Sequence, residues 1–374
     1  MSEVNTDLVV EKTIKDSSET DVGQKRWFYV AQLPGGAISK GSADAPSGFM
    51  EMLGKANIAW VDYVTNDTSI DKEAVAAAVQ LGFSEQLLSS FCGKSYTNYL
   101  DFDTEVGVKL PSIQVRLSHV EPYPLLLLMK RNFILTVHPV NVDRRFTKLR
   151  RYSETVLKKI PVNAIAEDKM TLLLARIIDE NNDRNFEHLR QIEEKGDALN
   201  EALMDPHMPR TKIAPEIVQM KHALITYLNA LWDTLDVLHA LRYGDAELIT
   251  NEPVLLEKLG LLAEDVNRQI GLAEHMSEVL ASGLEVLSSI YNAQLQSLNN
   301  RMALFMTYLT IIGTAVLVPN TLATILGNAV FEIGPQDMGW YLALMIGSTA
   351  LATVGVYFWV KKSKWIPNKI DSIE

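Results

Sequence analysis

The chain has 374 residues, enough for two or three domains, and its net charge of −11 argues against a nucleic-acid partner. Its single cysteine, Cys92, excludes an intramolecular disulfide framework and a cysteine-based metal cluster, and we expect it to be a buried small apolar residue. No nucleophile constellation, phosphate-binding loop or cofactor fingerprint is present. We therefore expect neither an enzyme nor a bound cofactor.

Residues 1–25 are polar and mixed in charge, which predicts a disordered N-terminal tail and no secretory signal. Residues 26–160 predict an α/β domain. Its expected strands are short, rich in β-branched and aromatic residues, and bounded by Gly, Pro, Asn or Asp; they cover 26–33, 58–64, 112–120, 123–131 and 133–140. Residues 71–91 predict one or two helices between strands, and a tight hairpin is expected at Met129–Phe133.

Three acidic residues fall close together in the segment "LDFDTE". Asp101, Asp103 and Glu105 lie on one side of this segment if it is extended. Two interpretations remain open: a weak regulatory site for a divalent cation, or a charged edge strand whose charges prevent further pairing.

From about residue 144 the pattern becomes helical. Amphipathic helices are expected over 144–160, 166–203 and 216–243, and residues 161–253 predict a helical bundle. The proline-containing segment 205–215 is expected to break the run, and 243–253 to form a loop.

A single stalk helix is expected over 254–331. Its apolar residues recur at steps of three and four, which predicts one long buried stripe: Leu255, Leu259, Leu262, Val266, Ile270, Ala273, Met276, Leu280, Leu284, Leu287, Tyr291, Leu295, Leu298 and Met302. A helix of this length spans about 117 Å, of which a membrane takes roughly 30 Å. Partners for the stripe are expected from the preceding helices and from identical stalks around a symmetry axis.

Two uncharged runs near the C-terminus predict a transmembrane hairpin. Residues 302–331 and 338–360 contain no Asp, Glu, Lys, Arg or His, and each exceeds the roughly 20 residues that a helix needs to cross a bilayer. The expected spans are about 303–328 and 338–360, joined by an external loop at 332–337 and followed by a basic tail at 361–374. The fold class is therefore an α+β membrane protein.

The basic residues predict the orientation of this hairpin. The loop has no Lys or Arg, whereas both outer ends carry them, at Arg301, Lys361, Lys362, Lys364 and Lys369. By the positive-inside rule, both termini lie in the cytoplasm, and the chain is a multi-pass protein of the cytoplasmic membrane. Two spans per chain cannot enclose a pore, so a channel would require an oligomer.

The segment "MTYLTIIGTAVLVPNTLATILGNAVFE" (306–332) resembles the inner span of the CorA-type divalent cation transporters. The basic "KKSKW" (361–365), and "WVD" (60–62) with "FILTVH" (133–138), are similar to other parts of that family, so the resemblance covers about 55–365. It implies a homopentameric funnel that moves Mg²⁺ foremost, or Co²⁺, Ni²⁺ or Zn²⁺. Counted from "LTII", the family's Gly-Met-Asn motif falls on Gly327, Asn328 and Ala329, an atypical Gly-Asn-Ala.

In such a ring, one face of the first span would line the pore. Helical steps of three and four place on this face Met306, Leu309, Thr310, Gly313, Leu317, Asn320 and Thr324. The apolar members predict a cytoplasmic constriction, and Asn320, Thr324 and Asn328 predict polar rings towards the outside. Glu332 and Asp337 would place carboxylates around the external mouth and concentrate cations there, or would merely keep the loop out of lipid.

Two alternatives to a divalent cation channel remain: a non-conducting membrane scaffold that kept the fold, and a proton-coupled zinc transporter. The expected partners are further copies of the chain, the lipid bilayer and divalent cations.

Overall fold

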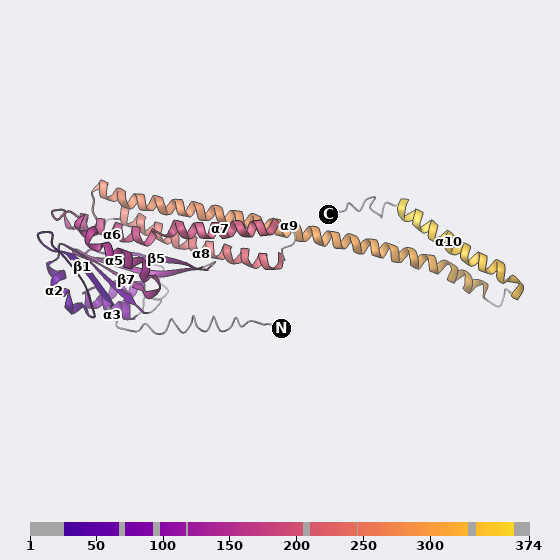
Figure 1. Ribbon diagram of the computed structural model, residues 1–374, viewed down its shortest axis with the longest axis horizontal. Coiled ribbons are helices and arrows are strands. Elements are labelled where there is room, and N and C mark those ends of the chain that lie inside the picture. Colours follow the sequence, from indigo (N-terminus) through magenta and orange to yellow (C-terminus); the bar gives the residue numbers. More distant parts are fainter. Residues whose placement is uncertain are drawn as a thin grey trace, which may run out of the picture. The chain divides into compact units, whose positions relative to one another are not determined.

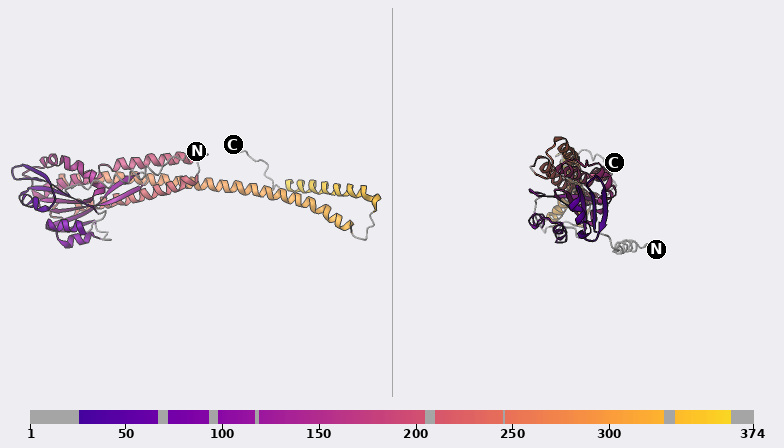
Figure 2. Two further views of the ribbon diagram at one scale, coloured as in Figure 1. Left: turned by 60° about the horizontal axis from the view of Figure 1, so that its bottom comes forward. Right: turned by 90° about the vertical axis from the view of Figure 1, so that its left-hand side faces the viewer.

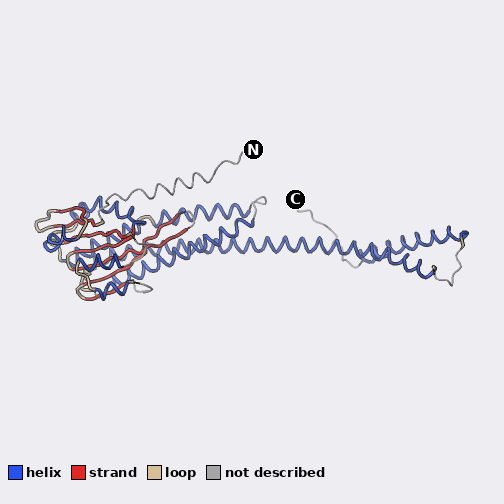
Figure 3. Tube along the Cα trace, turned by 90° about the horizontal axis from the view of Figure 1, so that it is seen from below, coloured by secondary structure: helices blue, strands red, loops and turns tan. Residues whose placement is uncertain are grey.

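The computed structural model describes residues 26–66, 72–92, 98–116, 119–204, 210–244, 246–327 and 334–362. The chain divides into two compact units, residues 1–284 and 285–374, termed here the N-terminal and C-terminal units. Every described strand belongs to the N-terminal unit, and the described part of the C-terminal unit is helical (Figure 3). The predicted tail, 1–25, lies outside the described residues.

A seven-stranded sheet forms the centre of the N-terminal unit (Figure 1). Its spatial order is β2 (Ile38–Ala43), β1 (Trp27–Gln32), β3 (Ile58–Thr65), β7 (Phe133–Pro139), β6 (His119–Lys130), β5 (Glu105–Arg116) and β4 (Tyr99–Phe102). All neighbours are antiparallel except β3 and β7, which are parallel. The predicted tight hairpin is confirmed, since Lys130 of β6 pairs with Phe133 of β7.

Helices cover both faces of this sheet, so its central strands are buried on both sides. One face packs against α2 (Met50–Lys55), α3 (Lys72–Gln80) and α4 (Glu85–Phe91), with Val61, Leu128 and Leu135 among the shared core residues. Side chains alternate along a strand, so Trp60 and Ile134 point to the other face. There α5 (Asp143–Lys158), α6 (Ala166–Asn182) and α8 (Arg210–Tyr243) lie against the sheet. Two 3₁₀ turns, Pro46–Gly48 and Val140–Val142, precede α2 and α5.

A buried polar network links β3, β7 and α5. The carboxylate of Asp62 is fully buried and accepts hydrogen bonds from Thr136 and, at 2.6 Å, from Nε of Arg150. His138 Nε2 lies 3.2 Å from the same carboxylate, and Arg150 also pairs with Asp143 at 2.8 Å. Burial alone would raise the pKa of Asp62, but Arg150 and then His138 outweigh burial and hold that pKa far below its usual range.

Three sequence-based boundaries are wrong. The expected strand 112–120 is the end of β5 and the start of β6, which pair at Arg116 and His119. The expected helix 166–203 is divided into α6 and α7 (Asn185–Met204). The expected break at 205–215 overlaps α8, which begins at Arg210 and contains Pro215. Pro215 is the sixth residue of α8 and removes a single backbone hydrogen bond, and the burial of Ile213 and Ile217 beside it offsets that loss.

The long helix α9 runs from Pro253 to Leu326 without interruption, against an expected helix over 254–331. Within the N-terminal unit its apolar stripe is buried, as expected, from Leu259 to Leu280, except for Leu262, which is half-buried. There it lies beside α7 and α8 (Figures 1 and 3), and Gln269 accepts a hydrogen bond from Asn185 at 3.2 Å. Further along, the stripe residues Tyr291, Leu295, Leu298 and Met302 are exposed.

Candidate functional site

The C-terminal unit contains the last part of α9, the short turn Pro335–Asp337 and α10 (Met338–Lys362). Two helices of the chain are long and apolar enough to cross a membrane, Pro253–Leu326 in its C-terminal part and Pro335–Trp359. In Figures 1 and 2, α10 folds back beside the end of α9 as a helical hairpin. Most apolar side chains of this hairpin are exposed in the single chain, as is expected of helices that contact lipid or other copies.

One face of α9 packs against α10. Among residues 302–327, only Ile311 and Ala315 are buried, and Leu304, Thr307 and Leu322 beside them are half-buried. The matching stripe on α10 is half-buried and consists of Tyr341, Met345, Ser348, Thr349, Ala352, Thr353 and Val356. Sequence reasoning missed this contact, although small residues at steps of three and four, such as Ser348 and Ala352, are typical of close helix packing in membranes.

The predicted pore-lining residues lie on the opposite face of α9. Met306, Leu309 and Leu317 are 60%, 57% and 63% exposed, and Thr310, Gly313, Asn320 and Thr324 are exposed as well. At 100° per residue this face is centred roughly 150° around the helix from the stripe that contacts α10. The seven residues are therefore brought together on one face that α10 leaves uncovered.

This face presents oxygen atoms at three levels. The hydroxyl groups of Thr310 and Thr324 donate hydrogen bonds to the carbonyls of Met306 (2.9 Å) and Asn320 (2.8 Å). Their hydrogens are therefore occupied, while the lone pairs of the same oxygens remain able to accept. The amide of Asn320 adds a carbonyl oxygen between them. Neutral oxygen groups of this kind suit the water shell of a hard divalent cation.

The end of α9 accounts for the glycine of the mouth motif. The amide of Gly327 donates to the carbonyl of Ala323 at 2.8 Å, and a Cβ at this position would lie only 2.9 Å from that oxygen. A side chain at residue 327 would therefore force the last turn of α9 apart. Asn328, Ala329 and Glu332 lie outside the described residues, so their predicted roles stay predictions.

Asp337 has a structural role in addition to carrying a negative charge. Its two carboxylate oxygens accept from the amide of Gly334 and from Nε1 of Trp340, both at 3.1 Å. The carboxylate thus holds the turn before α10 and fixes an aromatic ring at the helix start.

The three acidic residues predicted as a regulatory metal site are spread around a hairpin on the edge strand β4. Asp101 is on β4, and Asp103 has a positive φ of 46° in the turn. Glu105 begins β5, and its carboxylate accepts from the amide of Ser84 at 3.0 Å. Partial burial and then Asp103 raise the pKa of Asp101. β4 is at the edge of the sheet, and in the described ranges no group of three or more His, Cys, Asp or Glu could hold a metal ion. The regulatory role of these three residues stays a prediction.

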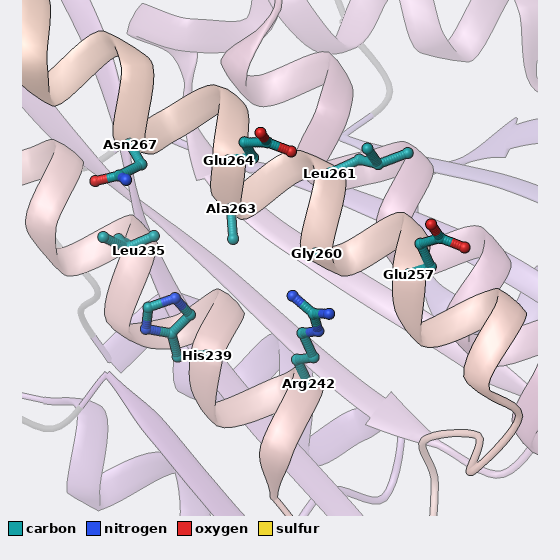
Figure 4. A pocket seen from close by; sticks show the side chains of 9 residues that line it. All are labelled: Leu235, His239, Arg242, Glu257, Gly260, Leu261, Ala263, Glu264 and Asn267. Carbon is teal, nitrogen blue, oxygen red and sulfur yellow. The ribbon is translucent and has the colours of Figure 1, made fainter.

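A pocket of about 390 Å³ lies between α8 and α9 in the N-terminal unit (Figure 4). His239 and Arg242 of α8 extend towards α9, where Gly260 leaves room for the guanidinium: a Cβ there would lie 2.5 Å from Arg242 Nη1. Glu257 and Glu264 stand at its rim. Because charges of both signs line it, this pocket shows no preference for one class of charged ligand.

A second buried polar cluster surrounds the junction of α6 and α7. Arg145 is 9% exposed and donates to the carbonyls of Asn181 (2.5 Å) and Ile113, which stabilises the C-terminus of α6. Burial lowers the pKa of Arg145 to about 10. Burial, and next the guanidinium of Arg145, lower the pKa of His188 to about 4.

This cluster makes the N-terminal unit acid-sensitive. The unfolded chain protonates His188 near pH 6.5, whereas the folded chain does so only near pH 4, so stability falls as the pH is lowered from 6.5 towards 4. Since His188 is partly exposed, we expect its share of the drop in thermal midpoint between pH 7 and pH 5 to be only about 3 °C. His188→Gln should show a correspondingly flatter profile in thermal unfolding. Parallel profiles for the two proteins would contradict this prediction.

Comparison with known proteins identifies the family. The sequence profile of the CorA-like Mg²⁺ transporter protein family matches residues 55–362. No individually curated protein is similar enough in sequence to count as a match.

Solved structures share the fold at low sequence identity. The complete CorA magnesium transporter from Methanocaldococcus jannaschii is 17% identical, with a TM-score of 0.63 over 92% of this chain and 100% of that one. The full-length CmaX protein is 15% identical, with a TM-score of 0.58 over 91% and 100%. The ZntB cytoplasmic domain from Vibrio parahaemolyticus is 14% identical, with a TM-score of 0.51 over 72% and 100%. The chain therefore belongs to the family of CorA-like Mg²⁺ transporter proteins, as a membrane transporter with two candidate transmembrane helices.

Proposed function

We propose that five copies of the chain form a channel for divalent cations in the cytoplasmic membrane, with both termini in the cytoplasm. Mg²⁺ is the foremost candidate ion, followed by Co²⁺, Ni²⁺ and Zn²⁺. The observation that carries the proposal is the division of α9 into two faces: α10 covers one, and the other exposes every predicted pore-lining residue in the described part of the helix. An uncovered face with aligned oxygen groups is what a shared axial pathway requires.

The chemistry along this face suits a hydrated cation. In a five-fold ring, Thr310, Asn320 and Thr324 would each supply five neutral oxygen groups that hydrogen-bond to the water shell of the ion. Mg²⁺ loses its waters reluctantly, so contact through that shell binds it without trapping it. Met306, Leu309 and Leu317 would form apolar rings, which conduct when wet and close when they lose water.

The acidic loop would attract cations before they reach the part of the pathway that selects among them. Five copies of Asp337, held in place by the turn that its carboxylate organises, would raise the local cation concentration at the external mouth. Glu332 would add to the same ring. The basic residues at the end of α10, Lys361 and Lys362, support the cytoplasmic placement of the other ends.

Cation uptake into liposomes tests this proposal. Full-length protein, inserted and verified as a five-chain assembly by mass, is expected to admit Mg²⁺, with Co²⁺ and Zn²⁺ compared in parallel. Asn320→Ala should lower the flux about tenfold because it removes a polar ring from the pathway. Thr314→Ala, on the side of α9 that faces α10, serves as the matched control and should leave the flux within about twofold.

The same assay separates the alternatives. A well-inserted pentamer that passes none of the three ions would indicate a non-conducting scaffold. Zinc uptake that depends on a proton gradient would indicate a coupled zinc transporter. A protein that runs as a single chain would refute the channel altogether.

A further inference from the structure

An apolar groove of about 730 Å³ lies between α3 and α4 on the N-terminal unit. Its floor is formed by Val75, Ala76 and Val79 of α3, and Cys92 follows the end of α4 at one side. Lys72 and Glu85 place one charge of each sign at the rim. The volume is within the range of roughly 300–1,000 Å³ that is typical of binding sites, so a segment of several residues fits. Cys92 is half-buried here rather than fully buried as expected from the sequence.

The chain enters the fold beside α3, one of the two helices that form this groove. Arg26 is the first described residue, and its guanidinium forms an ion pair with Glu73 of α3. Glu73 also accepts a hydrogen bond from the hydroxyl of Tyr63 at 2.8 Å, which fixes it against the sheet. Glu73 follows Lys72, which lines the groove, so the 25 preceding residues join the fold beside the first turn of α3.

Those 25 residues contain one apolar run, "LVVEKTI" at residues 8–14, in an otherwise polar sequence. The run supplies Leu8, Val9, Val10 and Ile14, and it carries Glu11 and Lys12, one charge of each sign, as the groove rim does. Residues 15–25 could span up to about 36 Å when extended. The helix α3 is only about 14 Å long, so the connection reaches any point of the groove.

We propose that residues 8–14 of the same chain dock into the groove between α3 and α4. Docking would remove the apolar side chains of both surfaces from water, and it would place Lys12 and Glu11 within reach of Glu85 and Lys72. The tethered segment is present at a high effective concentration, which favours it over a segment from another molecule. Docking of residues 8–14 would be independent of cation transport.

The single cysteine of the chain is a built-in reporter for this docking. In full-length protein in lipid nanodiscs, the alkylation rate of Cys92 by a maleimide is expected to rise about tenfold in Val10→Asp, because the charge expels the segment from the groove and uncovers the thiol. Val22→Asp, in the same part of the chain but outside the apolar run, is the matched control and should alkylate at the wild-type rate. Equal rates in wild type and Val10→Asp would overturn the proposal.

A cysteine scan locates the segment directly. Cysteines introduced one at a time at Leu8, Val10, Lys12 and Ile14 are oxidised with copper phenanthroline, and at least one should form a disulfide with Cys92 within one chain, since a disulfide needs Cα atoms about 4.4–6.8 Å apart. Val22→Cys should not. Disulfides that join two chains, or none at any of the four positions, would overturn the proposal, and neither result bears on cation flux.

Discussion

Gly313→Phe is expected to abolish cation flux while leaving the assembly intact. Gly313 is on the face of α9 that α10 does not cover, and apart from the adjoining backbone of α9 and the two neighbouring residues no atom of the described residues lies within 4 Å of the position that its Cβ would occupy. A phenylalanine therefore fits the single chain without strain. In a ring of five copies, however, five aromatic rings would fill the shared pathway at one level. We expect the flux of Mg²⁺ into liposomes to fall about a hundredfold or more, because an apolar plug excludes the hydrated ion.

The neighbouring residue provides the control for this experiment. Ile312 is 61% exposed and lies about 100° around the helix, away from the predicted pathway. Ile312→Phe has the same final side chain at the same depth, so it should conduct within about threefold of the wild type. Both variants must retain the mass of the wild-type assembly. Blockage by Ile312→Phe together with conduction by Gly313→Phe would show that another face of α9, the one that contains Ile312, lines the pathway.

The long apolar elements could be predicted because their signals are local and strong. A charge-free run of bilayer length has few alternatives, so the hairpin of α9 and α10 follows from composition. The apolar stripe of α9 likewise predicts the buried side from Leu259 to Leu280.

Elements whose existence depends on distant partners could not be predicted in this way. The edge strand β2 has the sequence "ISKGSA", with no clear apolar alternation, and it forms because β1 offers a full row of backbone partners. Its turn did carry a signal: Gly35 and Gly36 have φ values of 90° and 85°, which other residues rarely adopt. The division between α6 and α7 contains neither Gly nor Pro, but it lies in a cluster of turn-forming residues, Asn181, Asn182, Asp183 and Asn185, which the amphipathic pattern concealed.

In the candidate site, too, some features follow from the local sequence and others depend on contacts with distant residues. Which residues of α9 share a face follows from helical geometry, and the structure places those seven together. Which face α10 covers depends on the contact between two helices, and one sequence does not contain that information except through small residues such as Ser348 and Ala352.

Asp62→Ala is expected to be the most destabilising single substitution in the N-terminal unit. Asp62 is fully buried and is the carboxylate on which Arg150, His138 and Thr136 converge. Removing it leaves the largely buried guanidinium of Arg150 with Asp143 as its one remaining ion-pair partner among the described residues. Breaking a buried pair from one side typically costs about 3–5 kcal/mol, so the thermal midpoint should fall by about 10 °C.

We expect the loss of stability to come from the charged guanidinium of Arg150 that no longer has Asp62 as a partner, and a second substitution tests this. Asp62→Ala combined with Arg150→Met removes both charges and replaces the guanidinium by an apolar chain, so it should recover about half of the lost stability. Glu154→Ala removes an exposed partner of Lys40, 3.8 Å away, and should change the midpoint by less than about 2 °C. If the double variant is instead as unstable as the sum of its single variants, the loss reflects packing around Trp60 and Phe146. Because the pKa of Asp62 is held below its unfolded value, its contribution is complete above about pH 4 and is lost as the pH falls further, so the wild type and Asp62→Ala should converge only in strong acid.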